Sequence, residues 1–424
     1  MEIEKIIKEK RIAYSKKAFK IAYRRYYLNR SEALKNINLK ELKERARKIK
    51  EKCIENLDNL VDITLENLEK NGIKTFFAKN SKDAIKILKK IIPEGEVIVK
   101  SKSNVIKEIG FEEAFSKRNK IIETDCGDFV LQICGEKATH PVTPALHLSI
   151  DKIVNVIRKK FGINLRKRPE DIVKFVSKYL RSKILASKYG LTGANFITSD
   201  GSVVIVENEG NISLLSRIPK YHVIVSTVDK ILNNLEEAMF FSKILAIYGT
   251  GTSAVSYINV ISSPSKTADI EKKIVYGMHG AKEVYLILVD NNRLKISKTD
   301  LKEVLYCINC GACLYSCPVY RQIFDYYGKN YFGGIGISKT FVLEGIGQAY
   351  NSGLYFCTTC SSCKDVCPLS IDVPNLIVRL REISVKNRLE TKSNMEMIEN
   401  IEAFGNPFGS SGDKKILPEK LYCC

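Results

Sequence analysis

Residues 307–320 read CINCGACLYSCPVY, and residues 357–370 read CTTCSSCKDVCPLS. Both stretches have the form C-x2-C-x2-C-x3-C-P, the spacing of bacterial two-cluster iron–sulfur proteins. Three cysteines at two-residue gaps wrap a loop around one face of a cubane and leave one iron without a ligand. The fourth cysteine lies too far along its own chain to turn back easily, so it reaches the other cube. The sequence therefore predicts two [4Fe–4S] clusters that exchange their fourth ligands.

The predicted ligand sets cross between the two motifs. The first cluster takes Cys307, Cys310, Cys313 and Cys367. The second cluster takes Cys357, Cys360, Cys363 and Cys317. A zinc pair is the alternative, but structural zinc usually takes two C-x2–4-C pairs separated by a longer loop. The proline after each fourth cysteine, which lacks an N–H, suits a sharp exit from the cluster, and Gly311 lets the backbone approach inorganic sulfide.

Helical segments flank the second motif. Residues 338–350 read SKTFVLEGIGQAY and residues 374–388 read PNLIVRLREISVKNR, and we interpret both as helix. This favours an α-helical ferredoxin module over residues 296–385, followed by a polar tail over residues 386–424. Gly333, Gly334 and Gly336 follow no strand and precede no Lys-Ser/Thr pair, so they make no phosphate loop and are interpreted as a turn.

The residues upstream of this module fall into two parts. Residues 1–70 predict helices that end at Asn71-Gly72, with Cys53 on the apolar face as a core residue. Residues 71–295 alternate short β-branched runs with helical stretches, which predicts an α/β domain with a largely parallel sheet. The runs are KTFFAK, EVIVKS, SVVIVENEG, HVIVSTVDK and EVYLILVD, and the helical stretches include NSKDAIKILKKII and IEKKIVYGM.

Composition limits the class of protein. A chain of 424 residues is too long for one ordinary core. It has no run of 18 apolar residues and no secretory signal, which predicts a cytoplasmic location. Thiols stay reduced there, so 13 cysteines indicate metal rather than disulfides. The net charge is +20, and residues 1–50 hold 17 basic against 6 acidic residues, which suits an anionic partner or peripheral contact with the inner face of a membrane.

Candidate site residues of the α/β domain lie in three loops. The KSKS stretch, residues 100–103, stands where a helix N-terminus can meet an anion, although an ordinary N-cap is the simpler interpretation. Residues 123–147 hold two histidines, and Cys126 and Cys134 are not in metal spacing with them. Two carboxylates follow the strand-like run SVVIV, where ligands of open α/β sheets gather. The catalytic candidates are Lys100, Lys102, His140, His147, Glu207 and Glu209.

The order of these motifs resembles the lactate-utilisation protein B family. The motifs are KSKS, ETDCGD, HPVTPALH, GLTGANF, VENEGN and CINCGACLYSCPVYR. The resemblance implies a LUD domain, similar in fold to the ribose-phosphate isomerase and CoA-transferase group, joined to a two-[4Fe–4S] module. It implies the iron–sulfur electron-transfer subunit of a flavin-independent complex that oxidises L-lactate to pyruvate. The expected partners are a cysteine-rich disulfide-reductase-like subunit, a second LUD-domain subunit and a small 2-hydroxy acid.

Two other functions stay open at this point. The chain could serve another oxidoreductase complex, acting on glycolate, a thiol or disulfide, or a quinone. It could also be a redox-sensing nucleic-acid-binding protein, because aromatic residues interleaved with basic ones can stack on bases; here these are Tyr14, Tyr23, Tyr26 and Tyr27, which could equally pack against the protein itself. No G-x-G-x-x-G follows a strand, so no flavin or nicotinamide site is expected. Cys423 and Cys424 could be a remnant ligand pair.

Overall fold

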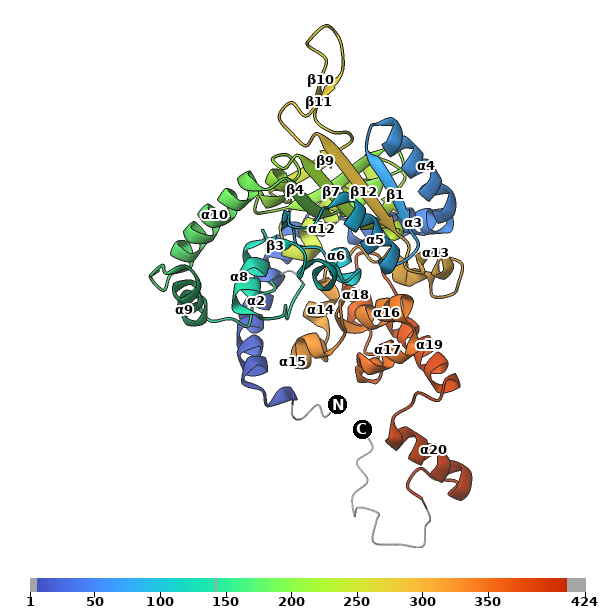
Figure 1. Ribbon diagram of the computed structural model, residues 1–424. Coiled ribbons are helices and arrows are strands. Elements are labelled where there is room, and N and C mark those ends of the chain that lie inside the picture. Colours follow the sequence, from blue (N-terminus) through green and yellow to red (C-terminus); the bar gives the residue numbers. More distant parts are fainter. Residues whose placement is uncertain (1–5, 142, 410–424) are drawn as a thin grey trace.

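A six-stranded parallel sheet lies at the centre of the protein (Figure 1). The computed structural model describes residues 6–141 and 143–409; Cys423 and Cys424 therefore lie outside the described residues. The strand order is β1-β12-β7-β4-β2-β3, and every neighbouring pair is parallel, which confirms the predicted α/β sheet. The strands are β1 (Lys74–Ala78), β2 (Val97–Lys100), β3 (Lys120–Glu123), β4 (Tyr189–Gly193), β7 (Tyr221–Thr227) and β12 (Glu283–Val289).

Helices cover both faces of this sheet, which explains its nearly continuous apolar strands. Successive residues of a strand face opposite sides; Ile98 packs in one apolar cluster and Val99 in the other. The helices on the first side are α5 (Ser81–Ile91), α6 (Asn104–Glu108) and α7 (Phe111–Phe115). Those on the second side are α8 (Cys126–Cys134), α9 (Ile150–Phe161), α10 (Pro169–Ala186) and α11 (Asn211–Leu215).

A second, four-stranded sheet has the order β8-β5-β6-β9. Its strands are β5 (Phe196–Thr198), β6 (Ser202–Glu207), β8 (Ile231–Leu232) and β9 (Tyr257–Ile261). Strand β6 lies between antiparallel neighbours, so the predicted strand SVVIV exists but belongs to this smaller sheet. Helix α12 (Leu235–Leu245) packs against β5, β6 and β8.

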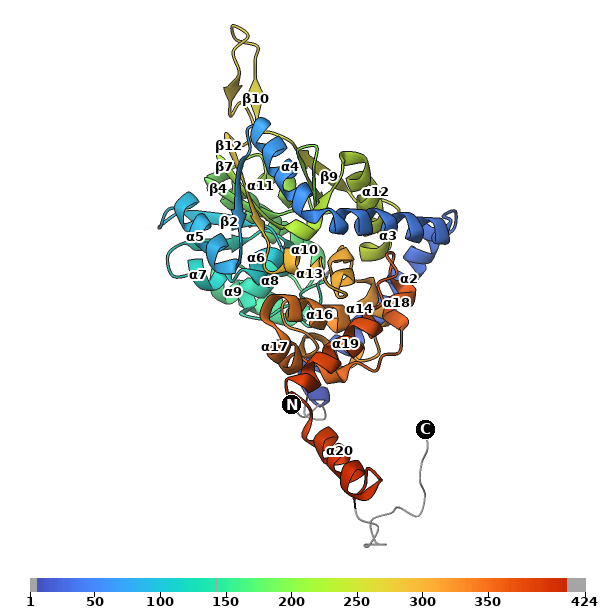
Figure 2. The same ribbon diagram turned by 90° about the vertical axis from the view of Figure 1, so that its right-hand side faces the viewer.

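The helices predicted for the N-terminal region are confirmed within the described residues. They are α2 (Lys10–Leu34), α3 (Leu39–Glu55) and α4 (Leu57–Lys70), and α4 ends at the predicted Asn71-Gly72. Cys53 is fully buried in the core, as expected. Figure 2 shows α3 and α4 running along one side of the molecule.

The helix predicted at IEKKIVYGM is wrong. This segment contains β11 (Val275–Tyr276), which pairs with β10 (Lys266–Thr267) in a hairpin that projects from the body (Figure 1). Glu271 and Lys272 adopt the left-handed conformation, which a helix does not allow. The apolar residues of this segment are exposed, so no tertiary contact favours the helix.

The cysteine-rich region is built from helices. They are α14 (Ala312–Ser316), α15 (Tyr320–Ile323), α16 (Gly333–Glu344), α17 (Ile346–Asn351), α18 (Ser362–Val366) and α19 (Val373–Lys386). The glycines interpreted as a turn lie instead in the first turns of α16. A Cβ at Gly336 would stand 2.3 Å from the carbonyl oxygen of Tyr331, so these glycines serve close packing rather than a turn.

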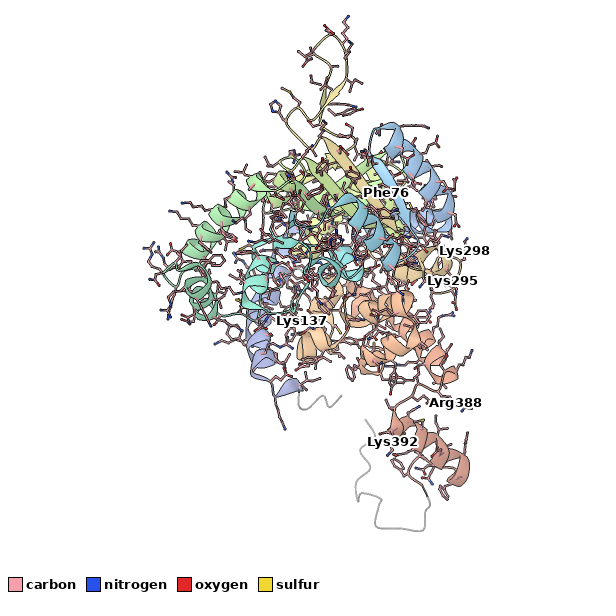
Figure 3. The ribbon with its side chains drawn as sticks, viewed as in Figure 1. Phe76, Lys137, Lys295, Lys298, Arg388 and Lys392 are labelled. Carbon is pink, nitrogen blue, oxygen red and sulfur yellow. The ribbon has the colours of Figure 1, made fainter. Side chains whose placement is uncertain are left out.

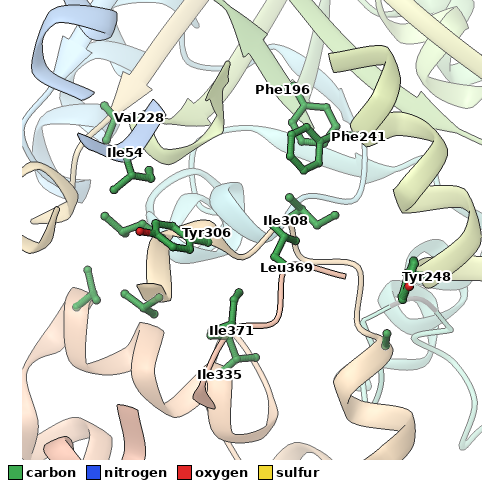
Figure 4. Close-up of a cluster of buried hydrophobic side chains, with 14 of the residues drawn as sticks. Ile54, Phe196, Val228, Phe241, Tyr248, Tyr306, Ile308, Ile335, Leu369 and Ile371 are labelled. Carbon is green, nitrogen blue, oxygen red and sulfur yellow. The ribbon is translucent and has the colours of Figure 1, made fainter. Parts of the chain in front are cut away.

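The cysteine-rich region and the α/β domain share one hydrophobic core (Figure 4). Phe196 and Phe241 contribute from the second sheet and α12, and Ile308, Leu369 and Ile371 contribute from the loops beside the cysteines. The two parts are therefore held in a fixed relation by apolar packing. Among the described residues, no helix is long and apolar enough to cross a membrane.

Candidate functional site: two cysteine-lined cavities and an interdomain cleft

The eight motif cysteines divide between two cavities. The larger cavity, here called the interdomain cleft, has a volume of about 1030 Å³. Cys307, Cys310, Cys313, Cys363 and Cys367 line it. A second cavity is lined by Cys313, Cys317, Cys357, Cys360 and Cys363. Each cavity therefore contains the four thiols of one predicted crossed set, together with a thiol of the other set, so the donor sets fit two adjacent clusters.

The fourth cysteine of each motif lies close enough to thiols of the opposite motif for the two to affect each other's pKa. Burial and then the neighbouring thiol of Cys367 raise the pKa of Cys310 to about 12. In the second set, burial raises the pKa of Cys317, and the thiols of Cys357 and Cys360 raise it further. Crowded, buried thiols do not ionise readily in water-free surroundings, and a bound metal removes their protons instead.

The two motif loops have the same backbone shape. Asn309 and Thr359 occupy equivalent positions, and both are left-handed, with φ of 61° and 53°. Gly311 (φ 78°) and Ser361 (φ 64°) are the next equivalent pair, each directly before a short helix. A non-glycine residue pays about 1–2 kcal/mol for this conformation, which local hydrogen bonds must offset. The repeated shape is therefore a property of the loops and not only of glycine.

Buried cations underlie the loop of the first motif. Lys230 Nζ donates to the carbonyl oxygen of Cys307 over 2.9 Å, and Lys339 donates to Asn309 Oδ1. Asp229 forms ion pairs with Lys230 (3.1 Å) and with Arg293 Nε (2.7 Å). These side chains come from the α/β domain and from α16, so charge as well as apolar packing fixes the Cys307 loop against the domain.

The α/β domain contributes the other wall of the interdomain cleft. Lys100 and Glu123 end strands β2 and β3, stand opposite each other in the register, and form a buried ion pair. Lys100 Nζ also lies 3.4 Å from Glu112. Burial lowers the pKa of Lys100, but attraction to Glu123 and Glu112 outweighs this and raises it overall. Lys100 therefore stays cationic at the carboxyl edge of the sheet, where α/β proteins place ligands.

Lys100 is fully buried and is not among the residues that line the cleft, but two other predicted site residues, Lys102 and His140, do line it. Lys102 Nζ lies 3.8 Å from Asp128. His140 Nδ1 accepts from the backbone N–H of Thr143 over 3.1 Å. Burial, with a smaller contribution from Lys102, lowers the pKa of His140 to about 3, so the ring is neutral and carries its proton on Nε2.

The remaining predicted site residues are not among the residues that line the cleft. Glu207 accepts from the backbone N–H groups of Ile212 (2.6 Å) and Ser213 (2.7 Å) at the start of α11. Glu209 accepts from the backbone N–H of Cys126, at the start of α8, over 3.0 Å. His147 Nδ1 lies 3.1 Å from the hydroxyl of Thr139. The structure thus brings Lys102 and His140 to the cleft, buries Lys100 against the cleft residue Glu123, and gives Glu207 and Glu209 helix-capping contacts.

Sequence reasoning missed the acidic residues of the cleft. Glu123 and Asp128 both line it, and Lys107 donates to Asp128 Oδ1 over 3.1 Å. The signal was present, because ETDCGD ends one strand beside the strand that carries KSKS. Parallel pairing of β2 with β3 then brings the two loops to one edge.

The tyrosines considered for nucleic-acid stacking divide between the core and the surface. Tyr26 is buried, stacks on Tyr315 with ring centroids 4.1 Å apart, and donates to the carbonyl oxygen of Tyr248. Tyr23 packs near Tyr315 and lies under the guanidinium of Arg321. These two rings therefore pack α2 against the cysteine-rich region. For Tyr23 and Tyr26 this favours packing against the protein itself over stacking on bases. Tyr14 and Tyr27 are exposed.

Two family models match the chain. Residues 61–289 match the LUD domain, and residues 303–371 match the 4Fe-4S dicluster domain. The fold and the two cysteine-lined cavities thus define an iron–sulfur protein that has a LUD domain and two [4Fe–4S] clusters as its cofactors. The chain belongs to the lactate utilization protein B family.

Two relatives from Bacillus species support this membership. Lactate utilization protein B of Bacillus cereus (strain AH820) is 32% identical over 380 residues, which cover 88% of this chain and 78% of that protein. The Bacillus cytotoxicus protein of the same name is 32% identical over 371 residues, covering 86% and 76%. A solved DUF162 family protein from Deinococcus radiodurans is 13% identical with a TM-score of 0.28, and it covers 55% of this chain and 98% of that one.

Proposed function

We propose that this chain is the iron–sulfur electron-transfer subunit of a flavin-independent complex that oxidises L-lactate to pyruvate. The observation that carries the proposal is the interdomain cleft, because the polar edge of the sheet and the Cys307 motif face the same cavity. When bound, each [4Fe–4S] cluster takes up and releases one electron, so two clusters match the two electrons that lactate loses. The names of the relatives support lactate as the substrate.

The crossed ligand assignment is part of this proposal. Cys307, Cys310, Cys313 and Cys367 hold the cluster beside the interdomain cleft, and Cys357, Cys360, Cys363 and Cys317 hold the other. Cys360 is exposed, whereas Cys310 and Cys313 are only partly exposed. The second cluster is then the one closer to solvent, and it would be the point of exit to a partner.

We further propose the domain limits 1–70, 71–295, 296–385 and 386–424. The last two are an α-helical ferredoxin module and a polar tail whose residues 410–424 lie outside the described part. The likeness of the LUD domain to the ribose-phosphate isomerase and CoA-transferase group stays a prediction.

Lactate is expected to reduce the clusters only in the assembled complex. The chain purified anaerobically with its partners should give the EPR signal of reduced [4Fe–4S] clusters when L-lactate is added. Acetate, which has no hydroxyl group to oxidise, is the matched control and should leave the spectrum unchanged. Glycolate tests the neighbouring substrate class. Reduction by glycolate but not by L-lactate would contradict the proposed substrate and leave the electron-transfer role in place.

We propose that α20 (Lys392–Phe404) docks a partner subunit. The helix projects from the body in Figures 1 and 2, and Figure 3 shows Arg388 in the segment that leads into it and Lys392 at its start. Its large apolar residues are all exposed, and all but Met397 recur at a three-residue spacing; they are Met395, Met397, Ile398, Ile401 and Phe404. A solvated apolar stripe of this length is typical of a helix that packs on another protein. The partner we expect is the cysteine-rich disulfide-reductase-like subunit, with a second LUD-domain subunit as the third component.

Replacing Ile398 and Ile401 together with aspartate is expected to abolish co-purification of the cysteine-rich subunit. Two charges placed on the apolar stripe would have to be desolvated at the interface. Iron content should be unchanged, because α20 has no buried residue and does not support the clusters. Glu399→Gln on the same helix is the control. Retention of the partner by the double variant in a pull-down would refute this docking surface.

Helix α2 carries the excess basic charge of the N-terminal region. Its outward face includes Lys17, Lys20, Arg24 and Arg25 next to the exposed Ile21 and Leu28. Basic residues interleaved with apolar ones suit an anionic lipid surface. We therefore propose a cytoplasmic protein with peripheral contact to the membrane through this face.

A further inference from the structure

A residue at the edge of the sheet that lines the interdomain cleft has a carboxylate oxygen without a hydrogen-bond partner among the described residues. Glu123 lines the cleft and is almost fully buried. Its Oε1 pairs with Lys100, whereas its Oε2 accepts no hydrogen bond from any described residue. A buried polar atom without a partner has lost its hydrogen bonds to water without replacement, which destabilises the protein. This loss suggests that a ligand supplies the missing donor.

The protonation of Glu123 suits this role. Burial raises the pKa of Glu123 to about 7, helped by Asp128 and Glu112 and opposed by Lys100. These three groups, from α8, α7 and β2, are the charged neighbours that bear on its carboxyl group. The carboxyl group is therefore partly ionised at neutral pH, and its carboxylate form accepts a hydrogen bond from an alcohol.

Two lysines line the same cleft beside Asp128. Lys102 and Lys107 line the cleft and flank Asp128, at 3.8 Å and 3.1 Å. An ammonium group has three N–H donors, and Lys107 uses one of them on Asp128. Asp128 holds both ammonium groups together at the cleft, which is a suitable arrangement for binding a carboxylate.

The opposite wall of the cleft is formed by the loop of the first cysteine motif. Cys307, Cys310 and Cys313 line the same cavity as Lys102, Lys107 and Glu123. A cavity of about 1030 Å³ is larger than eight cluster atoms require, so room remains for a small organic ligand.

We propose that the interdomain cleft binds a small 2-hydroxy acid, with Lys102 and Lys107 holding its carboxylate and Glu123 Oε2 accepting the hydrogen bond of its hydroxyl group. This assignment rests on the proposed function and gives that function its substrate site on this chain. Glu112, Glu123 and Asp128 also line the cleft, so their negative charge selects a carboxylate over a more highly charged anion such as phosphate.

The test measures binding by the full-length holoprotein rather than turnover. Isothermal titration calorimetry under anaerobic conditions gives the Kd of L-lactate and of acetate, which lacks the hydroxyl group. Lys102→Met is expected to weaken both ligands about tenfold or more, because each loses a charged hydrogen bond. Glu123→Gln is expected to weaken L-lactate by a similar factor and to leave acetate nearly unchanged, because only lactate uses Oε2.

Matched controls separate recognition from folding. Lys243→Met and Glu236→Gln change exposed residues that do not line the cleft, and they should bind L-lactate as the unchanged protein does. Because Glu123→Gln leaves Lys100 buried with a weaker partner, that variant could fail to fold. Lys107→Met, at a partly exposed position, then replaces it and should weaken both ligands as Lys102→Met does.

The outcomes separate this proposal from the proposed function. If Lys102→Met and Lys107→Met bind L-lactate with unchanged Kd while the assembled complex still oxidises lactate, the site lies elsewhere and the proposed function stands. If the unchanged holoprotein binds L-lactate with the expected variant pattern but the complex does not oxidise it, the cleft assignment stands and the lactate-oxidising function fails. If the unchanged holoprotein binds no carboxylate at all, the cleft assignment is overturned.

Discussion

Replacing Cys367 with alanine is expected to remove the cluster beside the interdomain cleft and to lower the iron content from about eight to about four per chain. Cys367 belongs to the second motif in sequence, but it lines the cavity of the first. An uncrossed arrangement would instead make Cys367 a ligand of the more exposed cluster. Iron and acid-labile sulfide analysis gives the number of clusters lost, and EPR of the reduced protein shows which of the two signals disappears.

The EPR signals that are lost in a set of cysteine variants show whether the two ligand sets cross between the motifs. Cys367→Ala and Cys310→Ala should abolish the same EPR signal, and Cys317→Ala should abolish the other one together with Cys357→Ala. Cys134→Ala, outside both motifs, is the control and should keep both signals. If Cys367→Ala instead removes the signal that depends on Cys357, the ligand sets do not cross, and the division of thiols between the two cavities has another cause.

Local spacing made the cluster region predictable from sequence. Loop geometry around a cubane is set by a few neighbouring residues, so the repeated motif carries most of the information. The parallel sheet was predictable for a related reason, since strands buried on both faces must be apolar throughout. Helix α19 also followed from local pattern, whereas the helix predicted over residues 338–350 breaks at Gly345 into α16 and α17.

Local pattern failed where tertiary contacts decide the structure. IEKKIVYGM has an apolar spacing that suits a helix, yet nothing packs on it, and it forms part of a projecting hairpin. The glycines before residue 337 suggested a turn because their composition is that of a turn. Their actual role is the close approach of α16 to Tyr331 and Val373, which no local rule encodes.

In the candidate site, too, local sequence predicted some residues and tertiary contacts decided others. Lys100 and Lys102 were identified because they follow a strand in a polar loop. Glu123 was not, because its importance comes from its register with Lys100 across two strands. Glu207 and Glu209 carry the same local signal as a site, but their oxygens accept from backbone N–H groups at the starts of α11 and α8. Sequence therefore indicates which loops gather at the sheet edge, and pairing decides which side chains meet there.

Replacing Arg293 with methionine is expected to destabilise the protein by about 3–5 kcal/mol, because it leaves the buried Glu108 without its main partner and the buried Asp229 with Lys230 alone. Arg293 makes two hydrogen bonds to Glu108, of 2.9 Å and 2.8 Å, and pairs with Asp229. Burial raises the pKa of Glu108, but Arg293 outweighs this and lowers it overall. Tyr331, from the cysteine-rich region, donates to the same Glu108 over 2.7 Å, so the loss would also weaken the attachment of that region.

The control for Arg293→Met is a variant of Arg379, whose ion pair with Asp300 is exposed. Arg379→Met removes the ion pair with Asp300, whose side chain is 61% exposed, and should cost no more than about 1 kcal/mol. Chemical denaturation of the two holoproteins under anaerobic conditions, followed by circular dichroism and by cluster absorbance, gives the free energies of unfolding. Because the buried network includes Asp229, which also pairs with Lys230 beside Cys307, cluster absorbance should be lost at lower denaturant in Arg293→Met. Equal stabilities for the two variants would mean that apolar packing alone holds the cysteine-rich region on the sheet edge.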